Sequence, residues 1–220
     1  MNKKRIKTVI LCDGRQPGAG SLKEAINESE YFIAADGGGN VARRLNMIPD
    51  IVIGDMDSYV IEKKEEAEII HDPDQETNDL EKSLKHAIKL KSTDVVVFGA
   101  VGKRLDHTLK NLSVLCRFNS SFSSLVFKDR HGEIFLLPER FVRTYPVGTT
   151  LSLFPISGIT EGVTTKGLAY PLVNESLENG VRDGTSNKTI RPEIEITHKK
   201  GDLLLFVASL AEEKKRQKSS

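Results

Sequence analysis

Acidic residues in the first half of the chain gather at or just beyond the ends of short apolar runs. They stand beside glycine turns and a few cations, and they are Asp36, Asp55, Asp57, Asp74, Asp79 and Asp106. In an open α/β sheet, ligands bind beyond the carboxyl ends of the strands. Several carboxylates at such an edge predict a site that holds Mg²⁺ and a polyphosphate.

Asp55 and Asp57 form the sharpest part of this pattern. If the strand before them continues to Gly54, both carboxylates project from the loop at its carboxyl end. Two carboxylates one residue apart repel each other unless a cation lies between them. Mg²⁺ suits such a pair when phosphates supply its remaining ligands. The alternative is a turn with two solvated aspartates.

A glycine-rich turn, Asp36-Gly37-Gly38-Gly39, follows the second apolar run. Glycines at the end of a strand allow backbone N–H groups to approach a phosphate closely. The spacing matches neither a Walker A loop nor the dinucleotide-binding fingerprint. A tight turn without a ligand is therefore the alternative to a nucleotide site.

Asp79 lies at the start of an expected helix. Asn78 and Glu81 have the spacing of a capping box, which places Asp79 in the first turn. Lys82 lies on the same side of the helix, so a carboxylate and an ammonium could bind metal and phosphate together. An exposed ion pair would give the same pattern.

A second glycine loop, 99–102, leads into another expected helix that carries Arg104, Asp106 and His107. An arginine there can stabilise the charge that builds on a transferred phosphoryl group. We expect His107 to orient a neighbour rather than to act as a base, because phosphoryl transfer depends mainly on positioning and charge neutralisation. The residues do not identify a general base.

The elements that must position these groups alternate between strand and helix. Strands are predicted at 8–12, 31–35, 51–53, 68–71 and 95–98, and helices at 22–29, 41–46, from 78 and from about 105. This alternation predicts an α/β fold with a mostly parallel sheet. The expected apolar faces of the last two helices are Leu80, Leu84, Ala87 and Ile88, and Leu105, Leu109, Leu112 and Cys116.

After about residue 124 the helical pattern stops. Short strand candidates at 125–127, 133–137, 149–154, 162–165 and 203–207 predict a small antiparallel sandwich or barrel. We therefore expect an α/β domain at 1–124, an all-β domain at 125–212 and a disordered tail at 213–220. In the β half, Ser186 and Asn187 could read the polar edge of a heterocycle and Tyr170 could stack on it, although a turn and ordinary sheet packing explain them too.

Composition narrows the class of protein. A net charge of +1 removes the main argument for nucleic-acid binding. The only cysteines, Cys12 and Cys116, lie far apart, which favours a reducing compartment, and we expect the protein to be cytoplasmic. No apolar run approaches the roughly 18 residues of a membrane span, so no membrane partner is expected.

Taken in order, the motifs resemble those of the thiamine pyrophosphokinase (thiamin diphosphokinase) family. The matching segments are 35–38, 49–58, 74–82, 99–107, 166–172 and 185–187. They extend from about residue 31 to residue 190, and the ordered set is far more specific than any one motif.

The resemblance implies an N-terminal α/β domain that binds ATP and a C-terminal β-sandwich that binds thiamine. It implies a homodimer with shared active sites, in which the sandwich of one subunit faces the α/β domain of the other. The implied reaction transfers pyrophosphate from ATP to the hydroxyl of thiamine, with Mg²⁺, and gives thiamine diphosphate and AMP.

The resemblance also implies roles for single residues. The catalytic acids would be Asp55, Asp57, Asp79 and Asp106, of which Asp55, Asp57 and Asp79 would hold the metal. The ATP-binding residues would be Asp36, Gly37, Gly38, Lys82, Arg104 and His107. The substrate-binding residues would be Gln75, Tyr170, Ser186 and Asn187.

One position departs from the family pattern. Lys103 stands where the family usually has glycine, in a loop expected to need a positive φ, so we expect strain there and an effect on the rate. Two other functions are compatible with the first domain. One is a pyrophosphokinase that acts on a hydroxymethylpterin, and the other is a non-catalytic nucleotide sensor.

Overall fold

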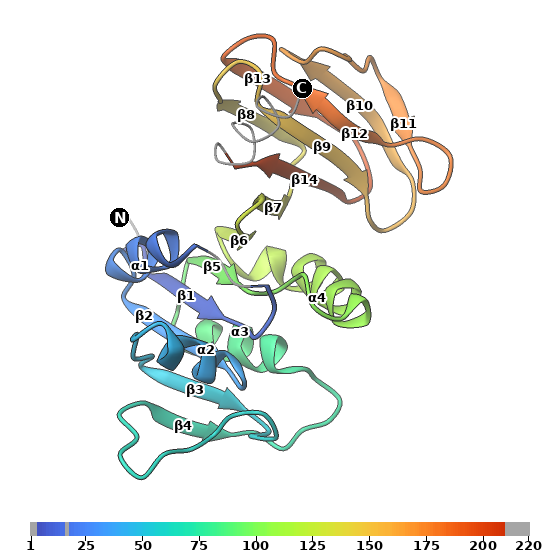
Figure 1. Ribbon diagram of the computed structural model, residues 1–220. Helices are drawn as coiled ribbons and strands as arrows, with labels where there is room; N and C mark the ends of the chain where they lie inside the picture. Colours follow the sequence, from blue (N-terminus) through green and yellow to red (C-terminus); the bar gives the residue numbers. More distant parts are fainter. Residues whose placement is uncertain (1–3, 16–17, 210–220) are drawn as a thin grey trace. The chain divides into compact units, whose positions relative to one another are not determined.

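The computed structural model describes residues 4–15 and 18–209, and the chain divides into two compact units after Asp129 (Figure 1). The tail at 213–220, for which disorder is expected, lies outside the described residues. Among the helices within those ranges, none combines the length and the apolar character that crossing a bilayer requires.

The N-terminal unit is built on six parallel strands in the order β6-β5-β1-β2-β3-β4. Their bounds are β1 Lys7–Leu11, β2 Tyr31–Ala35, β3 Ile51–Gly54, β4 Glu68–His71, β5 Asp94–Phe98 and β6 Ser124–Lys128. β1 pairs with β2 on one side and with β5 on the other. The strand order therefore reverses beside β1, where doubly wound sheets open a crevice for ligands.

Within the described part of this unit, four helices cover the sheet: α1 Ala19–Asn27, α2 Gly38–Arg44, α3 Asp79–Lys89 and α4 Leu105–Phe118, which continues into the 3₁₀ turn η1 Asn119–Ser121. Leu22 of α1 and Val41 of α2 pack with Val9 and Phe32 of the sheet in one buried cluster. α3 contacts β1, β2 and β3, and Figure 1 shows it on the opposite side of the sheet from α2. Burial on both faces accounts for the continuous apolar runs of the strands.

Helix α3 begins as the sequence predicts. The Asn78 side chain accepts a hydrogen bond from the Glu81 N–H at 2.9 Å, and the Glu81 carboxylate accepts one from the Asn78 N–H at 3.3 Å, which completes the capping box. Leu80, Leu84 and Ala87 are buried as expected. Ile88 is 41% exposed, so its place on the apolar face was wrongly predicted.

The predicted apolar face of α4 is wrong. Leu105 and Leu109 are 72% and 59% exposed. The buried stripe consists of Asn111, Val114, Leu115 and Phe118. The predicted face and the buried face both have helical spacing. The buried face includes the polar residue Asn111, so a search for apolar residues alone does not select it. Helix α2 also differs from expectation, because it begins at Gly38 rather than at residue 41, so the glycine turn forms its first turn.

As far as residue 209, the C-terminal unit contains two sets of four strands, in the orders β12-β9-β14-β7 and β11-β10-β13-β8. The neighbours within each set are antiparallel. The bounds are β7 Gly132–Leu136, β8 Arg140–Thr144, β9 Thr150–Pro155, β10 Thr160–Lys166, β11 Glu175–Leu177, β12 Gly184–Lys188, β13 Glu193–Thr197 and β14 Leu203–Ala208. Leu151, Leu205 and Ile194 are fully buried, so this unit has its own core.

Candidate functional site

A cavity of about 250 Å³ lies in the N-terminal unit where the strand order reverses. Its walls come from the segments after β1, β2 and β5 and from the first turns of α3 and α4. Five of the site residues predicted from the sequence line this cavity: Asp36, Gly37, Asp79, Arg104 and His107. The fold therefore brings several of the separate sequence motifs to one place, as the parallel sheet predicts.

Asp36 fixes the loop that follows β3. Its backbone has a φ of 41°, a left-handed conformation that aspartate adopts more readily than most residues. Its two carboxylate oxygens accept hydrogen bonds from the N–H groups of Ser58 and Tyr59, each at 3.1 Å. Burial raises the pKa of Asp36 above its usual value, against the opposing effect of these hydrogen bonds.

The neighbouring glycines allow close packing of the turn. A Cβ atom on Gly38 would lie 2.0 Å from the carbonyl oxygen of Leu11, so only glycine fits against β1 there. A Cβ atom on Gly37 would lie 3.2 Å from the Asp13 side chain. Gly37 faces the cavity, whereas Gly38 is buried against the strand.

Three carboxylates, those of Asp36, Asp55 and Asp79, each place one oxygen within 4.8 Å of the other two. We call them the three-carboxylate group. The buried ammonium of Lys82 lies 3.4 Å from an Asp79 oxygen. Burial raises the pKa of Asp79 despite the charge of Lys82, and the charges of Asp36 and Asp55 add to this effect. Three carboxylates against one ammonium leave an excess of negative charge, and their oxygens are the ligands that Mg²⁺ prefers.

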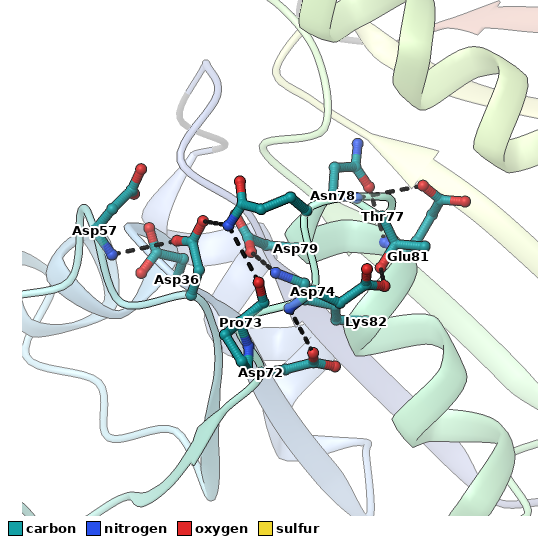
Figure 2. A network of polar contacts seen from close by, with 12 residues as sticks. Asp36, Asp57, Asp72, Pro73, Asp74, Thr77, Asn78, Asp79, Glu81 and Lys82 are labelled. Carbon is teal, nitrogen blue, oxygen red and sulfur yellow. Dashed lines mark hydrogen bonds and ion pairs between the residues drawn. The ribbon is translucent and has the colours of Figure 1, made fainter.

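Asp57 lies beside this group without joining it. Its backbone N–H donates to Asp55 at 3.2 Å, and its carboxylate accepts a hydrogen bond from the Ser58 hydroxyl at 2.8 Å. Figure 2 shows its carboxylate extending away from that of Asp36. The Gln75 amide donates to the second oxygen of Asp55 at 3.2 Å, so this predicted substrate contact also orients a carboxylate of the group. The backbone N–H of Asp57 lowers the pKa of Asp55.

Arg104 and Asp106 face each other at the start of α4. The guanidinium makes two contacts with the carboxylate, at 3.1 Å and 2.6 Å, and both side chains are exposed. The hydrogen bond from Arg104 lowers the pKa of Asp106. The His107 N–H donates to Asp106 at 3.0 Å. Asp106 is therefore paired with Arg104 and does not belong to the three-carboxylate group.

The expectation of a strained Lys103 is wrong. The positive φ angles of this loop belong to Gly99, at 68°, and Gly102, at 95°. Lys103 is not among the residues with positive φ, so its side chain costs no backbone strain. Its ammonium instead reaches Asp13, the residue that lies two positions after β1.

Two residues that line the cavity, Asp13 and Asn111, were not predicted from the sequence. Asp13 follows β1 much as Asp36 follows β2, so the same search for acids beyond apolar runs would have found it. Asn111 has no comparable signal, because its partners are distant in sequence. Cys12 also lines the cavity, and burial, with the charges of Asp79 and Asp13, raises the pKa of its thiol to about 12, which keeps it protonated at neutral pH.

The predicted substrate residues of the C-terminal unit lie near one another. The buried Asn187 side chain accepts a hydrogen bond from the Tyr170 N–H at 3.0 Å and donates to the Tyr170 carbonyl at 2.7 Å. It therefore holds the backbone of Tyr170, whose side chain is 72% exposed. Ser186 lies in an irregular part of β12 with a φ of 59°, and its N–H donates to Ser152 at 3.0 Å.

Two family models match the chain. The model described as thiamin pyrophosphokinase, catalytic domain, matches residues 22–127, and the model described as thiamin pyrophosphokinase, vitamin B1 binding domain, matches residues 140–203. Among curated proteins, Thiamin pyrophosphokinase 1 of Caenorhabditis elegans is 30% identical over 183 residues, which cover 76% of this chain and 75% of that protein. Thiamine pyrophosphokinase of Bacillus subtilis is 25% identical and covers 91% of this chain and 98% of that protein.

Solved structures show the same fold. The yeast thiamin pyrophosphokinase aligns with a TM-score of 0.83 at 18% identity, over 96% of this chain and 89% of that one. The enzyme of Candida albicans aligns with a TM-score of 0.82 at 19% identity, over 93% of this chain and 89% of that one. With both domain models matched in order and relatives at about 30% identity, the chain belongs to the thiamin pyrophosphokinase family.

Proposed function

We propose that the protein transfers the pyrophosphoryl group of ATP to the hydroxyl of thiamine and so produces thiamine diphosphate and AMP. The observation that carries this proposal is the three-carboxylate group beside buried Lys82, at the sheet edge where the family's catalytic-domain model matches. Clustered acids with one ammonium suit a metal-bound polyphosphate better than a neutral ligand.

We propose that Asp36, Asp55 and Asp79 hold Mg²⁺, which would neutralise charge on the phosphate oxygens when bound. Asp57 and Asp106 stay in the proposal as acids that match the family motifs, although their carboxylates lie outside the three-carboxylate group. The ammonium of Lys82 is already held beside Asp79. Arg104 and His107 line the cavity, where they can contact ATP. Their part is to position the phosphates and to offset negative charge during transfer.

The C-terminal unit is proposed to form a β-sandwich that binds thiamine through Tyr170, Ser186 and Asn187, with Gln75 contributing from the N-terminal unit. The match of residues 140–203 to a vitamin B1 binding domain supports thiamine over a pterin as the acceptor. The Asn187 side chain holds the backbone of Tyr170 through two hydrogen bonds, and the Tyr170 ring is exposed. We therefore assign stacking on thiamine to Tyr170 and the positioning of Tyr170 to Asn187.

We also propose a cytoplasmic homodimer with shared active sites. In such an isologous pair, each subunit would contribute to both sites. Mixing Asp79→Asn chains with chains carrying Tyr170→Ala and Ser186→Ala tests this arrangement. Shared sites would restore one intact site in each heterodimer and part of the activity. Sites within single chains would stay damaged.

The reaction is tested by incubating the protein with ATP and Mg²⁺ and offering thiamine, a hydroxymethylpterin or no acceptor in parallel. The proposal expects AMP to form with thiamine alone. AMP formation only with the pterin would assign the other pyrophosphokinase reaction. ATP binding without AMP in any of the three mixtures would assign a sensor.

A further inference from the structure

Two asparagine amides, the partly buried Asn78 and the buried Asn111, join the start of α3 to the loop after β5. Asn111 of α4 is only 8% exposed. Its amide nitrogen donates to the Ala100 carbonyl at 2.7 Å, and its oxygen accepts a hydrogen bond from the Asn78 amide at 2.8 Å. We call this chain of contacts, from Asn78 through Asn111 to Ala100, the asparagine bridge.

The direction of the bridge is fixed by its two ends. The Ala100 carbonyl can only accept, so the nitrogen of Asn111 must face it and its oxygen must face Asn78. The Asn78 oxygen already accepts the Glu81 N–H as the helix cap, which leaves its nitrogen for Asn111. Each amide therefore uses both its donor and its acceptor, and an apolar side chain of similar volume supplies neither.

The bridge holds a carbonyl of this loop, that of Ala100, through a side chain of helix α4. The carbonyls of Gly99 and Val101 accept hydrogen bonds from Gly14 and Arg15, at 2.8 Å and 2.7 Å. Ala100 lies between them, and its carbonyl is bound by Asn111 instead. The loop is thus held on two sides, by the segment after β1 and by helix α4.

The far end of the bridge is equally well anchored. The Glu81 carboxylate is fully buried and is contacted by two cations of α4, Lys110 at 2.9 Å and Arg117 at 2.7 Å. These ion pairs fasten the first turn of α3 to α4. Asp79, which belongs to the three-carboxylate group, lies in that turn directly after Asn78.

We infer that Asn111 is a positioning residue that sets the distance between the three-carboxylate group and loop 99–104, which comprises the glycine loop 99–102 with Lys103 and Arg104. This inference rests on the proposed function, in which Asp79 holds the metal and the loop leads to the cations at the phosphates. Asn78 and Asn111 both line the cavity, so the bridge forms part of the wall between these two groups. Small displacements of such groups cost large factors in rate because the reacting atoms must be aligned.

The test combines two variants and their double mutant. Asn78→Ser keeps a good N-cap but is too short to reach Asn111, and it introduces no charge. Asn111→Leu has a similar volume and removes both hydrogen bonds. Ser113→Ala, on the exposed side of α4, is the matched control. Turnover, the KM for thiamine and amide hydrogen exchange of residues 99–104 are measured for each, together with the Tm.

We expect each single variant to lower kcat about tenfold while the KM for thiamine stays within about twofold. The double mutant should be no slower than the slower single variant, because both changes break the same bridge. Loop 99–104 should exchange faster in both variants, whereas α3 should exchange at the wild-type rate in Asn78→Ser. The control should match wild type in every measurement.

Multiplicative losses in the double mutant, or unchanged exchange of the loop in both variants, would overturn the inference. So would a kcat within twofold of wild type in both single variants, or a loss of kcat that follows the fall in Tm alone. The hydrogen exchange does not depend on turnover. If the wild-type protein forms no AMP, the proposed function fails, while the exchange data still decide whether the bridge holds the loop.

Discussion

The ammonium of Lys103 lies 2.8 Å from a carboxylate oxygen of Asp13, across the cavity wall between the loops after β5 and β1. Both side chains are about half exposed, at 57% and 44%. An exposed pair of this kind contributes about 0–1 kcal/mol to stability. Because the backbone of Lys103 is unstrained, glycine at this position offers no relief of strain.

We therefore expect Lys103→Gly to be tolerated without a gain in activity. The Tm should stay within a few degrees of wild type, and kcat/KM should fall less than about tenfold, which corresponds to roughly 1.4 kcal/mol. Steady-state assays of AMP formation and thermal unfolding check this, with Lys103→Met as the control that removes only the charge. A larger loss in both variants would show that the ammonium itself binds phosphate.

Asp79→Asn should lower turnover at least a hundredfold, or roughly 2.7 kcal/mol of transition-state stabilisation, with little change in fold. Asparagine keeps the shape of the side chain and removes one anionic ligand from the three-carboxylate group. Asp57→Asn should also lower turnover, since it matches a family acid. It should change the Mg²⁺ concentration at half-maximal rate less than Asp79→Asn does. Equal Mg²⁺ shifts would place Asp57 among the metal ligands.

The stabilising effect of Mg²⁺ should depend on pH. Burial raises the pKa values of Asp36 and Asp79 in the folded protein. Their favourable contribution to stability is therefore present at low pH and is lost as the pH rises through the folded-state pKa values. Mg²⁺ binds the ionised carboxylates, so protons compete with it. The Tm gained on adding Mg²⁺ should be larger at pH 8 than at pH 5 and nearly absent in Asp79→Asn. A gain independent of pH would argue against these ligands.

Glu81→Gln should lower the Tm at neutral pH. Although burial opposes its charge, the hydrogen bonds from Lys110 and from the Asn78 N–H hold the pKa of Glu81 below its usual value of 4.5. Such a group adds stability above the unfolded-state pKa, and this is lost as the pH falls through the folded-state pKa. The Tm difference from wild type should therefore be clear at pH 7 and should shrink as the pH falls below 4.5 and through the lower folded-state pKa. Glu66→Gln, at an exposed site, should show no difference at either pH.

Local signals in the sequence predicted much of the first unit. The capping box at Asn78 and the buried run of β5 each depend on neighbours in the chain, and the structure confirms both. The order of the motifs was sufficient to identify the family. Asp36, Asp55 and Asp79 could be expected to meet because parallel strands end at one edge of the sheet.

The remaining features depend on contacts between distant segments. The buried face of α4 could not be chosen from its periodicity, since Asn111 is buried only because Asn78 and Ala100 complete its hydrogen bonds. Which glycine of the loop 99–104 needs a positive φ is likewise decided by packing, as the pairing of Gly99 with Gly14 shows. No short-range pattern records such contacts.

The most direct test of the central claim follows the terminal phosphate of ATP. ATP labelled at the γ-phosphorus is incubated with thiamine, Mg²⁺ and the protein, and the products are separated. The account predicts AMP and thiamine diphosphate in equal amounts, with the label on the terminal phosphate of thiamine diphosphate. ADP together with labelled thiamine monophosphate would contradict it, because that result would mean transfer of a single phosphoryl group.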